Sequence, residues 1–238
     1  MSVWQKIGNF FTLFNDKSTQ SNTNNKKSFS QIFDVNNFLF GGKDAAFTLA
    51  LVALSAKMAG ADGVVTNSEI AAFKASVEIP KGSEKQVERL FELAQSDVAG
   101  FESYAKKIKK LFLDQPQTLE YVLESLFYIA AADGVIHQDE LEYLKRVSEI
   151  FGFDDARFEQ IASAFLVDNN GADPYLVLGL SPSASDEEVR RVYRLLVGEN
   201  HPDRMFAKGV PKEMLEIANT RMAAINVAYK EISKARKL

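Results

Sequence analysis

The chain has 238 residues, of which 46% are hydrophobic and 25% are charged, a composition that excludes disordered and fibrous classes of protein. It carries 28 Lys or Arg against 32 Asp or Glu, and the net charge of −4 argues against a protein whose main role is to neutralise nucleic-acid phosphates. Because there is no Cys, disulfide scaffolds, thiol catalysis and Cys-ligated zinc are excluded, and a cytoplasmic, reducing compartment is expected.

Residues 1–14 form an amphipathic segment with no secretory signal. Its apolar residues recur at helical spacing, which leaves two interpretations open: a helix on the inner face of a membrane, or a helix docked on the protein itself or on a partner. The longest uncharged apolar run, residues 45–56, is too short to cross a bilayer core, which needs about 20 residues. Residues 15–43 are predicted to be a polar linker.

From residue 44 onward, apolar residues recur every three or four positions, and no clear alternating segment is found. This pattern predicts an all-α fold. Helices are expected at about residues 45–61, 67–79, 83–95, 98–113, 116–132, 138–151 and 154–166. They would form one compact helical bundle over residues 44–168.

This bundle contains an internal duplication, since residues 59–70 and 130–141 read alike. The aligned pairs are Asp62 with Asp133, Gly63 with Gly134 and Glu69 with Glu140. Each copy predicts a helix, a turn at a left-handed glycine, and a second helix.

The four duplicated carboxylates support two interpretations. Oxygen donors beside a turn suit a hard cation such as Ca²⁺ or Mg²⁺, and the candidate ligands are Asp62, Glu69, Asp133 and Glu140. Alternatively, each glutamate only caps its helix, as the spacing of Thr66 and Glu69 indicates in the first copy. His137 replaces that threonine in the second copy, which we expect to weaken the cap and which favours the metal.

The paired pattern A-x-A-D-G-V-[VI]-x4-E-[IL], found within residues 56–73 and 127–144, resembles the TerB-like (tellurite-resistance-associated) helical domain. The resemblance covers about residues 44–168. It implies metal binding through these acidic residues.

A loop-rich stretch near residues 168–173 separates a second module, residues 173–238. This module holds 11 Lys or Arg and 9 Asp or Glu, a net charge of +2 that points to an acidic partner. Ser185 and Glu188 form a capping box for a helix that runs to about Glu199, and a return helix is expected at about 211–228. The two antiparallel helices would display a loop at their tip. One helix face carries Arg190, Arg191 and Arg194.

The tip reads His201-Pro202-Asp203-Arg204. The proline stiffens the turn and keeps His201 out of helical geometry. Three interpretations arise: a general base oriented by Asp203, a helix stop with a solvated histidine, and a rigid recognition tip beside cationic residues. The first lacks an accompanying nucleophile, oxyanion donor or glycine loop.

Four segments, DPYLVLGL at 173–180, SDEEVRRVYR at 185–194, HPD at 201–203 and INVAY at 225–229, together resemble a J domain over about 65 residues. The stretch AKGVPKEMLE at 207–216 is similar, more narrowly, to DjlA-type co-chaperones, which join a TerB-like domain to a C-terminal J domain. Two features depart from that family. The chain shows no transmembrane helix, and residues 198–200 read GEN where J domains often carry a lysine and an aromatic residue.

The resemblance implies a co-chaperone that binds a DnaK-type chaperone and stimulates its ATPase without being an enzyme itself. The residues that match the family's contact motif are His201, Pro202, Asp203, Arg190, Arg191, Arg194 and Arg204. The alternative is a metal-binding stress-response scaffold in which the J module is a tether. No nucleic-acid partner is expected.

Overall fold

The computed structural model describes residues 43–58, 73, 84–96, 100–131, 134–165, 173–207 and 215–238. These residues form helices and contain no strand, which confirms the predicted all-α class. The helices are α4 (Lys43–Met58), α6 (Glu84–Ser96), α7 (Phe101–Leu111), α8 (Pro116–Ala130), α9 (Gln138–Phe151), α10 (Asp155–Ala162), α11 (Pro174–Leu178), α12 (Asp186–Glu199), α13 (Pro202–Ala207) and α14 (Leu215–Arg236). The amphipathic segment 1–14, most of the linker and most of the expected helix 67–79 lie outside the described residues.

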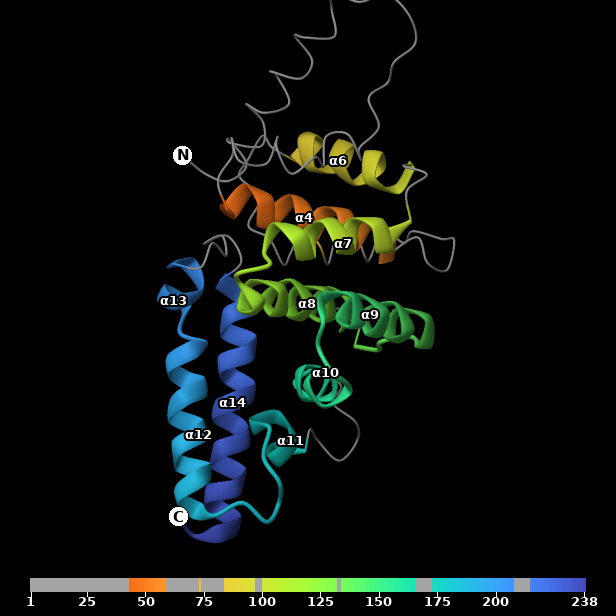
Figure 1. Cartoon of the computed structure of the whole chain (residues 1–238). Coiled ribbons are helices and arrows are strands. Elements are labelled where there is room, and N and C mark those ends of the chain that lie inside the picture. The colour runs from red at the N-terminus through yellow and green to blue at the C-terminus, as the bar shows by residue number, and fades with distance from the viewer. Residues whose placement is uncertain are drawn as a thin grey trace, which may run out of the picture.

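Helices α4 to α10 make up the bundle, with α4 packed against α6, α7 and α8 (Figure 1). Because α4 is apolar on nearly every side, it is stable only when other helices cover it on every side. Its buried residues include Phe47, Leu51 and Leu54, each fully shielded from solvent. Helix α8 begins with Pro116 at its first turn, as predicted, since a proline there removes no intrahelical hydrogen bond.

Helices α11 to α14 make up the second module, residues 173–238, which we call the J module. Helices α12 and α14 form the expected antiparallel hairpin (Figure 1), and Tyr193 stacks on Tyr229 with ring centroids 3.9 Å apart. Ser185 caps α12, accepting a hydrogen bond from the Glu188 N–H at 3.2 Å, as predicted. The buried core of the module consists of Val177, Leu178, Val189, Leu196, Ile225, Ala228 and Ile232.

The return helix ends at Arg236, so the prediction that it ends near residue 228 is wrong. Two interactions hold the extra turns. Ile232 is buried in the core of the J module, and the Arg236 guanidinium donates to the carbonyl oxygens of Pro182 and Ala184, each at 2.6 Å. These bonds tie the end of α14 to the turn before α12.

The tip of the hairpin lies against the bundle, while the opposite end of α12 and α14 points away from it (Figure 1). Pro202 begins a short helix, α13, where only a loop was expected. Met205 of α13 is fully buried and belongs to the core of the bundle. Within the described part of the chain, no helix is both long enough and apolar enough to span a membrane.

Candidate functional site

The His-Pro-Asp tip connects α12 to α13. His201 lies outside both helices, as predicted, and its carbonyl oxygen accepts from the N–H groups of Arg204 and Met205 at 2.9 and 3.1 Å, which starts α13. The side chains of His201 and Asp203 are 56% and 88% exposed. The tip is therefore anchored through its backbone and open through its side chains.

The imidazole of His201 has a defined orientation. Its Nδ1 accepts a hydrogen bond from the Asp203 N–H at 3.3 Å and lies 3.7 Å from the Asp203 carboxylate. An Nδ1 that accepts places the proton of a neutral imidazole on Nε2. Nε2 is thus the ring atom that can donate to a partner.

The arginines predicted to accompany the tip lie on the exposed side of α12. Arg190, Arg191 and Arg194 are all exposed, and the Arg194 Nε donates to the Arg190 carbonyl at 3.2 Å. Arg191 makes a long ion pair of 3.7 Å with Glu188. Arg204 is also exposed and lies beside Gly198, near the end of α12. The structure therefore places the predicted cations on α12 and on the adjoining tip.

The bundle contacts the chain on both sides of His201. On one side, the hydroxyl of Tyr121 in α8 donates to the carbonyl of Glu199 at 3.2 Å. On the other side, Met205 is inserted into the bundle core. Asn200, itself buried, bonds back to the Leu196 carbonyl at 2.8 Å and completes the end of α12.

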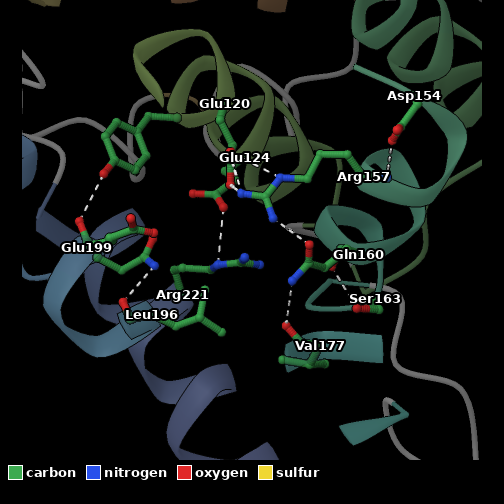
Figure 2. Close-up of polar contacts among 12 residues, drawn as sticks. Glu120, Glu124, Asp154, Arg157, Gln160, Ser163, Val177, Leu196, Glu199 and Arg221 are labelled. Carbon is green, nitrogen blue, oxygen red and sulfur yellow. Dashed lines mark hydrogen bonds and ion pairs between the residues drawn. The ribbon is translucent and has the colours of Figure 1, made fainter. Parts of the chain in front are cut away.

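A buried ion pair joins the two modules (Figure 2). Arg221 of α14 and Glu124 of α8 are both fully buried, with 3.2 Å between Nε and the nearer carboxylate oxygen. Burial raises the pKa of the Glu124 carboxyl to about 7, although the guanidinium of Arg221 acts in the opposite direction.

A second group of polar side chains lies beside this pair (Figure 2). The Arg157 guanidinium donates to the carboxylate of Glu120, at 2.6 Å to one oxygen, and also to the Gln160 side chain. The Gln160 amide in turn donates to the Val177 carbonyl of α11 at 3.4 Å. The J module is therefore attached to the bundle through α11 as well as α14.

The predicted metal site is only partly within the described residues, since Asp62, Glu69 and Asp133 lie outside them. Gly134 has the predicted left-handed backbone, with φ of 91°. A carboxylate oxygen of Glu140 accepts the backbone N–H of His137 at 2.9 Å. A capping box is thus present at the start of α9, so the expectation that His137 weakens this cap is wrong. No group of three acidic or histidine side chains suited to a metal is found among the described residues, and the metal stays a prediction.

Sequence reasoning missed the residues that join the modules: Glu120, Tyr121, Glu124, Arg157, Gln160 and Arg221. Two signals were present. Glu120 and Glu124 are four residues apart and are the charged residues of α8, a largely apolar helix, and Arg221 interrupts the apolar stripe of α14. Charged residues in apolar stripes are seldom fully buried unless they are paired, so each such residue predicts a partner.

Comparison with known proteins agrees with the order of the two modules. The family described as "Tellurite resistance protein TerB" matches residues 48–163, and the "DnaJ domain" family matches residues 173–237. "Co-chaperone protein DjlA" of Photobacterium profundum is 31% identical over 219 residues, which cover 82% of this chain and 79% of that protein. The protein of the same name in Coxiella burnetii is 29% identical over 203 residues, which cover 76% of this chain and 74% of that protein.

A third relative of that name, from Vibrio cholerae, is 34% identical over 146 residues, half of this chain and 51% of that protein. No solved structure matches the chain. The relatives and the two matched families confirm the resemblance drawn from the motifs. The chain therefore belongs to the family of DjlA-type J-domain co-chaperones.

Proposed function

We propose that this protein binds a DnaK-type chaperone through His201, Pro202 and Asp203 and stimulates the ATPase of that chaperone. The observation that carries the proposal is the exposed imidazole of His201, whose Nδ1 is occupied and whose Nε2 is available to donate. The tip needs no catalytic chemistry of its own in this role, because the hydrolysed ATP belongs to the partner.

The arginines of α12 support a steering role. A group of exposed cations attracts an acidic surface and raises the rate of encounter. Arg190, Arg191 and Arg194 lie on the same helix that leads into the tip, so an acidic chaperone surface that meets them is brought close to His201. Arg204 extends this cationic group at the tip itself.

The test is a steady-state ATPase assay with the cognate chaperone and the His201→Gln variant. Loss of one charge-assisted hydrogen bond costs about 1.5–3 kcal/mol, so stimulation is expected to fall at least tenfold. His137→Gln is the matched control, because it changes the other exposed histidine of the chain. Full stimulation by His201→Gln would falsify the proposal.

A second variant separates steering from stimulation. Replacing Arg190, Arg191 and Arg194 with alanine is expected to raise the concentration of this protein that half-saturates stimulation by about tenfold or more at low salt. That concentration should also depend much less on salt than it does for the natural chain. A control that replaces three lysines of α7, Lys106, Lys107 and Lys110, removes the same charge from the bundle. If both triple variants behave alike, the effect is one of net charge and not of this helix face.

A further inference from the structure

The end of α12 is where the J module leads into its tip. The last four carbonyl groups of a helix have no partner within the helix. One of them, the Glu199 carbonyl, accepts from the Tyr121 hydroxyl of the bundle at 3.2 Å. Tyr121 is itself buried, and burial raises the pKa of its hydroxyl, so the group stays protonated and able to donate. A side chain of the bundle thus helps to define where α12 stops, two residues before His201.

The other side of the tip is held by packing. Met205 follows His201 by four residues, is shielded from solvent completely and lies in the bundle core. His201 and Asp203 are therefore exposed side chains on a short segment whose two ends are both attached to the bundle. The position of the imidazole relative to α12 depends on these attachments.

The ion pair fixes the hairpin as a whole. Glu124 is on the same helix as Tyr121, one turn further along, and pairs with Arg221 in the first half of α14. Charges that face Glu124 come from three helices: Arg221 from α14, Arg157 from α10 and Glu120 from α8 itself. An attachment that buries both side chains completely allows few other placements of α14, because sliding either helix would leave a buried polar group without its partner.

We propose that α8 positions the tip, with Tyr121 and Glu124 as positioning residues that hold His201 at a fixed place relative to the arginines of α12. This inference rests on the proposed function, because the activity being positioned is stimulation of the chaperone. Binding and stimulation should then separate: the arginines set the concentration at which the chaperone is half saturated, and the α8 contacts set the maximal stimulation.

The mild test is Tyr121→Phe, which removes only the hydrogen bond to Glu199. One neutral hydrogen bond changes the equilibrium between the attached and the opened tip by a factor of about five. The rate of amide hydrogen exchange at residues 199–207 of the full chain is therefore expected to rise by about that factor. Maximal ATPase stimulation is expected to fall by up to about fivefold, with an unchanged half-saturating concentration. Tyr143→Phe is the matched control, since Tyr143 donates to the Leu54 carbonyl at 2.8 Å inside the bundle and away from the J module.

The stronger test reverses one charge of the buried pair. Glu124→Lys places two cations together and Arg221→Glu places two carboxyls together, and each is expected to raise exchange at residues 199–207 by roughly a hundredfold or more. The double variant restores opposite charges and is expected to recover both protection and maximal stimulation. Recovery by the double variant shows that both effects arise from the charges of this pair and not from either substitution alone.

The outcomes are decisive in either direction. Faster exchange at residues 199–207 together with lower maximal stimulation supports the inference. Unchanged exchange in Tyr121→Phe overturns it, and so does faster exchange with stimulation that is unchanged or higher, since higher stimulation means that the bundle restrains the tip. The proposed function fails separately, through full activity of His201→Gln, whatever the α8 variants do.

Discussion

Raising the pH from about 5.5 to about 8 is expected to loosen the contact between α14 and α8, because it ionises Glu124 within the interface. The pKa of this carboxyl is about 7 when the modules are docked, and its ordinary value of 4.5 returns when the carboxyl is hydrated. The docked state therefore binds more protons between these two values, so docking is strongest below about pH 4.5 and weakens as the pH rises through 7.

The size of this effect follows from the two pKa values. A tenfold change in an equilibrium corresponds to about 1.4 kcal/mol, so a carboxyl that moves from 4.5 to about 7 accounts for about 3 kcal/mol over the whole range. The docking equilibrium should then change by roughly three-hundredfold over the whole range, and by roughly thirtyfold between pH 5.5 and 8.

The assay is amide hydrogen exchange at residues 199–207, corrected for the intrinsic pH dependence of exchange. The matched control is Glu124→Gln, which keeps the shape of the side chain and stays neutral at every pH. We expect the protection of these amides to decrease as the pH rises in the natural chain and to stay constant in this variant. Equal protection of the natural chain at both pH values would refute the reasoning.

Two further predictions concern other parts of the chain. Gly179→Ala is expected to lower the free energy of unfolding, measured by urea denaturation, by about 1–2 kcal/mol or more. The reason is that Gly179 has a left-handed φ of 66° and that an added Cβ would collide with the Gln160 amide. Gly198→Ala is the control, within ordinary contact of its nearest neighbour, and is expected to leave stability unchanged or to raise it by about 0.5–1 kcal/mol. For the predicted metal site, calorimetry should detect binding of Ca²⁺ or Mg²⁺ that is lost in Asp62→Ala/Asp133→Ala, and unchanged binding in that variant would exclude these ligands.

The sequence predicts individual helices of this protein well where local chemistry determines their ends. Helix α9 has the predicted bounds, 138–151, because a glutamate caps its first turn and Gly152 closes its last turn with φ of 97°. Helix α12 likewise ends at the predicted Glu199 and starts beside the predicted cap, Ser185. These signals act over three or four residues, so they can be read without knowing the rest of the fold.

The arrangement of the two modules could not be predicted in the same way. Glu124 and Arg221 are 97 positions apart, and nothing between them indicates that they meet. Glu120 and Glu124 in a largely apolar helix indicate that each needs a partner, but not that the partners are Arg157 and Arg221. The predicted tip residues are exposed, but the prediction of a tip held only by its hairpin did not anticipate the contacts from α8.

The burial of Met205 in the bundle has a consequence for truncated fragments of this protein. A fragment that stops near residue 165 would lose the side chain that fills part of its own interior, and it would expose a hollow lined by apolar groups together with the Glu124 carboxyl. Such a fragment is expected to self-associate in solution. Grafting an unrelated J domain in its place would also require a side chain of similar bulk at this position.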